Sequence, residues 1–311
     1  MQRVTRADGT LFLTGGSNEV LRLYSNADLL PIASWRDRLA ARQAFFAARG
    51  VNWCMLLAPE KLSVHGDAVL PAGSVAPAQC LLDAVPHPCL VNPTAALRGL
   101  SPSGYATTDS HWLPEGAACA FGLVMAALGL PFDADMPHRL ALREVSFHGD
   151  LWDPSYKDML QDRFARRALP DNVQRVHANR IVAFKEAHGL ENEAGLHTGS
   201  HVVWRNSAAP QPARVVLFGS SFSEYRAECS LLSFLAAITF AEVHFVWSAD
   251  LDLGLIARIA PDIAILEMPE RFLTHCPRDD FDLAAHEDAA LARYDGLAGV
   301  SSSSSSSSSS C

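Results

Sequence analysis

The sequence lacks a long apolar run. Its longest apolar stretch, residues 117–130, contains two glycines and is shorter than the roughly 18 residues that a membrane-spanning helix requires. The polar start, residues 1–10, is followed by an apolar piece that is too short for the core of a secretion signal. We therefore expect a protein that does not span a membrane and that works in the cytoplasm, or in the periplasm if a signal precedes the N-terminus given.

Positive charge is also scarce. The chain has 25 Lys and Arg residues against 34 Asp and Glu residues, and its net charge is −9. Because a nucleic-acid-binding protein needs a basic surface to neutralise phosphates, we do not expect a nucleic acid as partner.

The seven cysteines lack C-x-x-C spacing, and several, such as Cys54, lie in apolar patterns. That pattern favours buried thiols over disulfides or a zinc site.

What is present is an alternation of short β-branched runs with helical apolar patterns. The order strand, helix, strand, helix, strand in the C-terminal half predicts a parallel sheet with right-handed crossovers. The expected strands are 51–58, 215–218, 243–247 and 262–268, and the expected helices are 35–48, 115–128, 224–240 and 251–259. A weaker pattern over 157–168 favours a solvated helix or an irregular segment.

These patterns predict one α/β domain. With 311 residues, 49% of them hydrophobic, the chain is long enough to bury a large core. We place this domain over 1–297, with a parallel central sheet and a less regular insertion at about 146–212. The serine tract cannot bury apolar surface, so we predict a flexible tail over 298–311.

A serine pair follows the strand expected at 215–218. In open α/β sheets, ligands gather at the carboxyl ends of the strands, and free amides in the first turn of a following helix can stabilise an anion. Ser221 is therefore a candidate nucleophile, although serines here could equally cap a helix. The second glycine of the G-x-S-x-G elbow is missing, which gives an α/β-hydrolase little support.

A candidate base lies upstream, in front of the helix expected at 115–128. Asp109 and His111 are two residues apart, so in an extended chain their side chains leave the same face. A carboxylate there can fix the imidazole tautomer and stabilise the imidazolium. The pair could also ligate a metal, but no third and fourth ligands stand at supporting spacing, so we do not predict a metal site.

These motifs resemble the SGNH-hydrolase-like family of the alginate O-acetyltransferases AlgJ and AlgX. That family has a G-D-S-F-S segment after a hydrophobic strand and a D-x-H-W segment upstream, and here 219–223 reads G-S-S-F-S and 109–112 reads D-S-H-W. The resemblance implies an SGNH-like (flavodoxin-like) three-layer fold and a triad of Ser221, His111 and Asp109. Ser220 departs from the family aspartate that is thought to brace the nucleophile turn.

The resemblance further implies a serine-dependent O-acetyltransferase that acts on a carbohydrate through an acyl-enzyme. No cofactor is expected beyond an acyl donor, which a partner protein could supply. The alternatives are a carbohydrate O-acetyl esterase with the same triad and a non-catalytic glycan-binding relative, which Ser220 keeps open. The candidate glycan contacts, each explained equally well by packing, are Lys61, Tyr105, Trp112, Tyr225 and Arg271.

Overall fold

The computed structural model describes most of the chain. The described residues are 3–16, 19–101, 103–140, 142–155, 162–226 and 230–303. Cys229, Cys311 and residues 304–311 of the expected tail lie outside them, and the five cysteines inside them are free. Within the described ranges, no helix combines the length and the apolar character needed to cross a bilayer.

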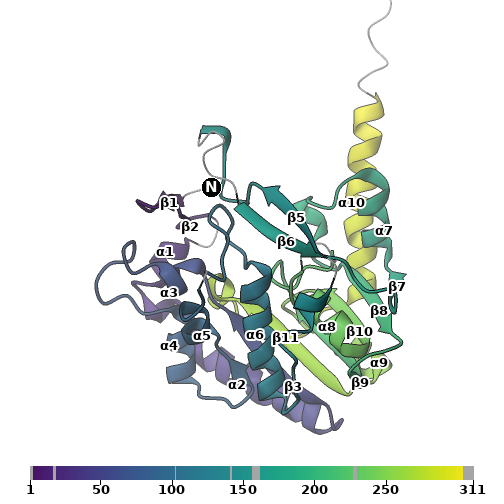
Figure 1. The fold of residues 1–311 in the computed structure, drawn as a ribbon. Coiled ribbons are helices and arrows are strands. Elements are labelled where there is room, and N and C mark those ends of the chain that lie inside the picture. The colour runs from purple at the N-terminus through teal and green to yellow at the C-terminus, as the bar shows by residue number, and fades with distance from the viewer. Residues whose placement is uncertain are drawn as a thin grey trace, which may run out of the picture.

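A seven-stranded sheet forms the centre of the fold (Figure 1). Its order is β4-β3-β11-β9-β10-β8-β7; the first five strands are parallel, and β8 runs antiparallel to both of its neighbours. The strands are β3 (Asn52–Ala58), β4 (Leu90–Val91), β7 (Val173–Ala178), β8 (His201–Asn206), β9 (Gln211–Gly219), β10 (Phe240–Trp247) and β11 (Ile263–Pro269). Two small antiparallel pairs stand beside it: β1 (Arg3–Thr5) with β2 (Leu11–Leu13), and β5 (Leu142–Phe147) with β6 (Asp162–Arg167).

Helices cover both faces of the sheet because its central strands are apolar on both sides. Cys54 and Leu56 of β3 pack into one core with α6 and α8, whereas Trp53 and Met55 pack into the other with α2, α4 and α9. The helices are α1 (Val20–Leu23), α2 (Ile32–Ala47), α3 (Lys61–His65), α4 (Pro77–Ala84), α5 (Thr94–Arg98), α6 (Pro114–Ala127), α7 (Arg180–His188), α8 (Leu232–Thr239), α9 (Leu253–Ile259) and α10 (Leu283–Ser303). This arrangement confirms the predicted α/β class with a largely parallel sheet.

The helix expected at 224–240 starts later than predicted. Ser223 and Glu224 both donate their backbone N–H to the carbonyl of Ser220, which closes one tight turn after β9. The helix α8 begins at Leu232, and Ser230 just before it has a positive φ of 52°. The turn that carries Ser221 is therefore separated from α8 by a loop.

The segment proposed as an insertion is more regular than its sequence suggests. Residues 162–167, expected to be helical or irregular, form β6, so that prediction was wrong; residues 157–161 lie outside the described part. The strands β7 and β8 extend the central sheet beyond β10. At the C-terminus, α10 continues to Ser303. The boundaries of the domain, the insertion and the tail stay predictions.

Candidate active site

The turn after β9 holds Ser221 at the carboxyl edge of the sheet. Glu267, at the end of the neighbouring β11, accepts hydrogen bonds from the Ser220 N–H (2.7 Å), the Ser220 hydroxyl (2.9 Å) and the Ser223 hydroxyl (2.8 Å). Only glycine fits at position 219, since a Cβ there would lie 2.3 Å from Ser223 Oγ. One buried carboxylate thus fixes the backbone on both sides of Ser221.

Burial governs the protonation of this bracing carboxylate. Glu267 is 2% exposed, and the loss of solvent raises its pKa above the usual range for glutamate, although the three donors partly oppose that shift. Ser220, which departs from the family aspartate, is one of the donors. A hydroxyl suits this position because a second carboxylate beside Glu267 would repel it.

Two further carboxylates hold the loop that carries Asp109 and His111. Asp162 of β6 accepts from the Thr107 N–H and from the N–H (2.6 Å) and hydroxyl of Thr108. Asp150, just after β5, accepts from the N–H and hydroxyl of Ser110, both at 2.7 Å. The β5–β6 segment therefore positions this loop against the sheet edge.

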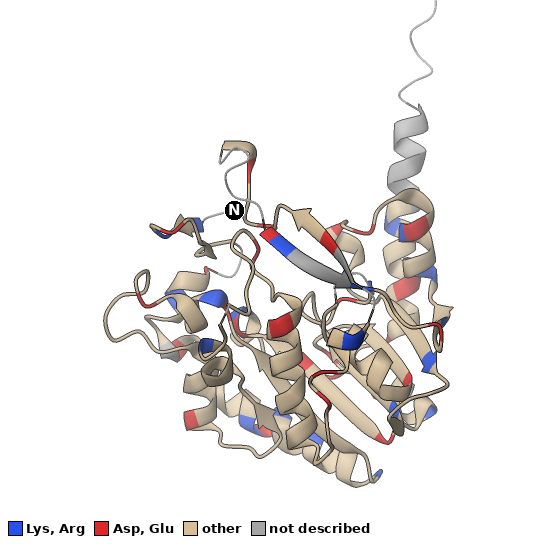
Figure 2. Cartoon of the chain, viewed as in Figure 1, with Lys and Arg blue, Asp and Glu red and all other residues tan. Residues whose placement is uncertain are grey.

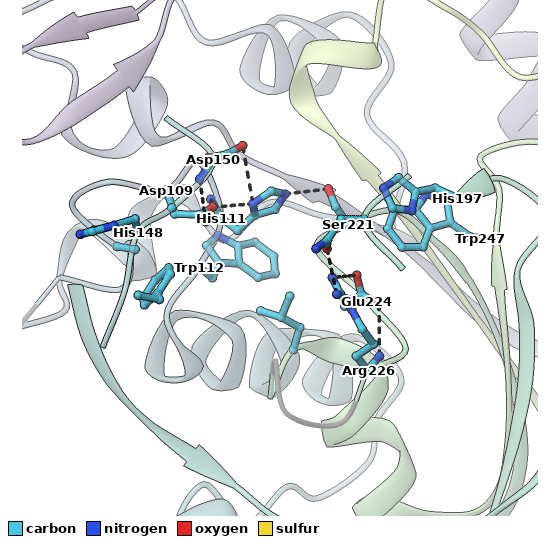
Figure 3. Close-up of a pocket in the computed structure, with 15 residues that line it drawn as sticks. Asp109, His111, Trp112, His148, Asp150, His197, Ser221, Glu224, Arg226 and Trp247 are labelled. Atoms are coloured by element: carbon cyan, nitrogen blue, oxygen red, sulfur yellow. Dashed lines mark hydrogen bonds and ion pairs between the residues drawn. The ribbon is translucent and has the colours of Figure 1, made fainter. Parts of the chain in front are cut away.

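Ser221, His111 and Asp109 lie in a continuous line (Figure 3). His111 Nε2 is 2.7 Å from Ser221 Oγ, and His111 Nδ1 is 2.6 Å from Asp109 Oδ1. With Nδ1 protonated, the imidazole donates to Asp109 and accepts from the serine hydroxyl at Nε2. Gly149 allows this approach, because a Cβ on it would lie 2.4 Å from Asp109 Cβ.

Asp109 and His111 each stabilise the charged form of the other. Burial alone would raise the pKa of Asp109, but the charge and hydrogen bonds of His111 outweigh it and hold that pKa below the usual range. Burial would lower the pKa of His111, yet the charge and hydrogen bond of Asp109, with a further contribution from Asp150, raise it above the ordinary value. His111 is thereby a stronger base than a free imidazole.

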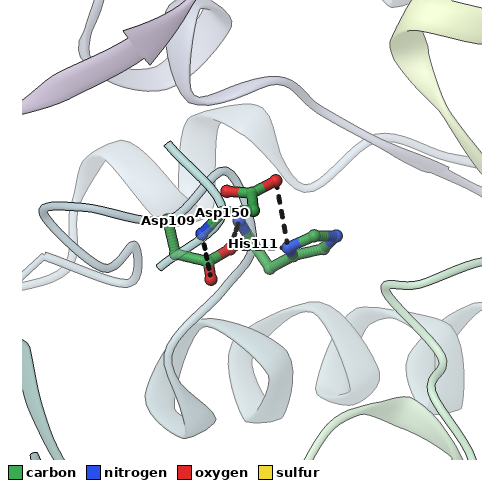
Figure 4. Close-up of side chains that lie close together, drawn as sticks. All are labelled: Asp109, His111 and Asp150. Carbon is green, nitrogen blue, oxygen red and sulfur yellow. Dashed lines mark hydrogen bonds and ion pairs between the residues drawn. The ribbon is translucent and has the colours of Figure 1, made fainter. Parts of the chain in front are cut away.

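Asp150 brings a third potential ligand beside the pair (Figure 4). The ligand atoms of Asp109, His111 and Asp150 lie within 4.8 Å of one another, and Asp150 Oδ2 is 4.0 Å from His111 Nδ1. The sequence reasoning gave Asp150 no role. Both imidazole nitrogens already face Asp109 and Ser221, and both oxygens of Asp150 accept from Ser110. This donor set fits a proton relay better than a metal ion.

The Ser221 Oγ opens into a cavity of about 540 Å³. Of the five candidate glycan contacts, Trp112 lines this cavity and lies against Phe222, with ring centroids 4.7 Å apart. The lining residues are Ala106, Asp109, His111, Trp112, Phe147, His148, Gly149, Asp150, Asn192, His197, Ser221, Glu224, Arg226, Leu231 and Trp247. This volume suits a small ligand or one sugar ring.

The other candidate contacts lie elsewhere. Lys61 is 3% exposed and donates from Nζ to the carbonyl of Leu11 (2.8 Å), and the Tyr105 hydroxyl donates to the carbonyl of Pro59. Arg271 is buried and donates to Glu60 (3.1 Å). These three side chains do not line the cavity at Ser221, and their roles as glycan contacts stay predictions.

Tyr225 lines a second cavity, of about 290 Å³, rather than the one at Ser221. Its hydroxyl has no hydrogen-bond partner among the described residues. Arg226 lines both cavities, so the second one adjoins the first.

The backbone N–H of Ser221 is a candidate donor for a developing oxyanion. The N–H of Ser221 donates to no acceptor in the described part of the chain, whereas the N–H of Phe222 donates to Ser220 Oγ at 3.2 Å. The sequence placed such donors at the start of a helix, but α8 begins only at Leu232. The free amide therefore belongs to the turn itself.

One wall of the cavity was not foreseen. His197 stacks on Trp247 with ring centroids 4.5 Å apart and an angle of 6°. Arg226 donates to Glu224 (3.0 Å) and to Asn192 (2.9 Å). These residues come from separate loops and from the end of β10, and no local motif links them in the sequence.

Comparisons with known proteins support the fold. No model of a protein family matches the sequence, and no curated protein does. Bacillus cereus PatB1 with a sulfonyl adduct has a similar structure, with a TM-score of 0.60 and 14% identity over 88% of this chain and 96% of that chain. The O-acetyltransferase domain of Pseudomonas putida AlgJ has a TM-score of 0.51 and 17% identity, over 93% of this chain and 100% of that chain. A DHHW family protein from Eubacterium siraeum has a TM-score of 0.58 and 13% identity, over 93% of this chain and 97% of that chain. The chain thus has the SGNH-like fold that the resemblance to AlgJ and AlgX implies.

Proposed function

We propose that this chain is a serine-dependent O-acetyltransferase that acts on a carbohydrate through an acyl-enzyme. The line from Ser221 through His111 to Asp109, which opens into a cavity, carries this proposal. Two structural neighbours add support: the AlgJ domain is an O-acetyltransferase, and PatB1 bears a sulfonyl adduct. Sulfonyl reagents capture activated nucleophiles, which is the chemistry expected of Ser221.

The proposed reaction has two halves. His111 Nε2 takes the proton of Ser221 as Oγ attacks the carbonyl carbon of an acetyl ester or thioester, and the Ser221 N–H donates to the oxyanion. The imidazolium then protonates the leaving group, and acetyl-Ser221 remains. In the second half, His111 removes the proton of a sugar hydroxyl as its oxygen attacks the acetyl carbonyl. The bond from the carbonyl carbon to Ser221 Oγ then breaks, and the imidazolium returns the proton to Oγ. Asp109 stays ionised throughout and orients the imidazole.

An esterase is the second candidate because the site is open to solvent. The His111 side chain is 22% exposed, so water can reach the base and take the acetyl group instead of a sugar. Both activities share the first half of the reaction. They differ in whether an acceptor hydroxyl outcompetes water at acetyl-Ser221.

A chromogenic acetyl ester, supplied with and without short glycan acceptors, tests both activities. We expect chromophore release, an intact mass increased by one acetyl group on Ser221, and loss of both in Ser221→Ala and His111→Ala. His188→Ala, at an exposed histidine of α7, is the matched control and should leave them unchanged. Acetylated sugar would identify a transferase, and free acetate alone an esterase. A folded wild type as inert as Ser221→Ala would refute catalysis.

A further inference from the structure

The cavity at Ser221 is acidic. The described residues that line it include three carboxylates, those of Asp109, Asp150 and Glu224, but only one guanidinium, that of Arg226. The side chain of Asp150 is 35% exposed, so a ligand can approach its charge directly. A ligand that carries carboxylates of its own would meet repulsion here.

The guanidinium is not available as an anion site. Arg226 donates from Nη2 to Glu224 Oε2 at 3.0 Å and from Nη1 to Asn192 Oδ1 at 2.9 Å, so Glu224 offsets its charge. Another cation near this wall, Lys185, lies over the Trp247 ring with Nζ 6.0 Å from its centroid. Lys185 is 0% exposed, donates to Ser200 (2.8 Å) and cannot contact a ligand in the cavity.

The adjoining cavity adds no excess of positive charge. Glu186 and Glu191 line it together with Arg175 and Arg226. Arg175 forms an ion pair with Glu186, and its charge is therefore also offset. Along the described part of the chain, Lys and Arg positions are interspersed with Asp and Glu positions (Figure 2).

The remaining wall suits a sugar ring. The stacked rings of His197 and Trp247 both line the cavity, and the apolar face of a pyranose can pack against such a ring. The carboxylate of Asp150 is an accessible acceptor, so it can take hydrogen bonds from sugar hydroxyls or from an ammonium group. Glu224 is 5% exposed and accepts from Arg226, so it contributes negative charge rather than a direct contact.

We propose that the acceptor is a glycan without carboxylate groups, with amine-bearing sugars preferred over neutral ones and uronates disfavoured. This inference rests on the proposed transferase function and names the substrate class of the same site. One acceptor carboxylate near Asp150 or Glu224 should lower kcat/KM by about tenfold at low ionic strength. The difference should shrink as salt screens the exposed charges.

Tetrasaccharides of glucosamine, glucose and galacturonate, offered with one acetyl donor, measure this preference. We expect kcat/KM to fall in that order, with at least a tenfold span that narrows in 0.5 M salt. Glu224→Gln should raise the galacturonate-to-glucose ratio severalfold. Asp37→Asn, at an exposed carboxylate of α2, removes the same charge away from the cavity and should leave the ratio unchanged.

Binding of the three tetrasaccharides to Ser221→Ala, followed by calorimetry, separates this inference from the proposed function. If wild type forms acetyl-Ser221 but galacturonate is an equal or better acceptor, the charge preference is refuted while the chemistry stands. If no acetyl-Ser221 forms, the proposed function fails, and the order of binding affinities still decides the preference. Failure of all three to bind would also overturn the inference.

Discussion

Removing the carboxylate of Glu267 should disable the nucleophile turn. This side chain accepts from the N–H and hydroxyl of Ser220 and from the hydroxyl of Ser223, and it is 2% exposed. Glu267→Ala leaves three buried donors without their acceptor, and each orphaned group costs about 1–3 kcal/mol. Relief from burying a carboxylate offsets part of this, so we expect a net loss of about 3–5 kcal/mol of unfolding free energy.

The effect on chemistry should exceed the effect of lost stability. If the turn moves Ser221 by about 1 Å relative to His111, kcat/KM for the chromogenic ester should fall by about 100-fold, with KM changed less than kcat. Glu267→Gln keeps one acceptor oxygen and the side-chain volume. It should lose less than tenfold in kcat/KM and about 1–2 kcal/mol in urea unfolding.

Glu270→Gln provides the matched control. Glu270 is a buried carboxylate three residues further along, but it accepts from the Ser63 hydroxyl and from the N–H groups of Glu60 and Ala78, away from the turn. It should change stability and leave kcat/KM intact. A folded Glu267→Ala protein with the kcat/KM of wild type would show that the turn holds Ser221 without this brace.

Three further outcomes follow from the geometry. Because the pKa of His111 is raised and Asp150 contributes to that rise, kcat/KM should fall on acidification at a pH above 6.5, and Asp150→Asn should move this limb to lower pH. Burial raises the pKa of Glu270 from 4.5 to about 7; the folded state then binds the extra proton, so stability should decrease by about 3 kcal/mol as pH rises through this window. Chemical unfolding at several pH values should show a flatter profile for Glu270→Gln, and an unchanged profile would contradict the assignment. Gly149→Ala would push a Cβ to 2.4 Å from Asp109 Cβ; acetyl-Ser221 formation should drop at least tenfold while circular dichroism stays native, and full activity would show that the loop accommodates the methyl group.

Much of the fold could be predicted from the sequence because its central strands are continuous hydrophobic runs. The runs at 51–58 and 262–268 are mostly apolar, and they form β3 and β11 side by side. The prediction for segment 162–167 failed because its alternation of charged and apolar residues matches a helix surface as well as a hairpin strand. The start of α8 was missed because the apolar pattern alone cannot show that Glu224 belongs to a tight turn.

The same difference separates the site residues that the sequence predicts from those that it does not. Ser221, His111 and Asp109 stand in short segments beside a patterned strand or helix, and the structure brings all three within hydrogen-bond distance. The roles of Asp150 and Glu267 depend on contacts between segments far apart in the chain, which spacing does not reveal. Lys61 illustrates the converse, since a lysine after a strand reads as a surface group although it is 3% exposed here.

Because Asp109 and His111 lie on one loop, the triad is built from only two segments of the chain. The base and its orienting carboxylate share a short piece of backbone, and Ser221 lies 110 residues beyond His111 on the sheet. Asp162 and Asp150 fasten the middle of this loop through hydrogen bonds, whereas Tyr105 and Trp112 at its two ends pack into the apolar core. Local release of such a segment requires less free energy than global unfolding. Heating should therefore abolish the proposed activity reversibly while the sheet is still intact, so the temperature limit of this activity would be set by the loop and not by the fold.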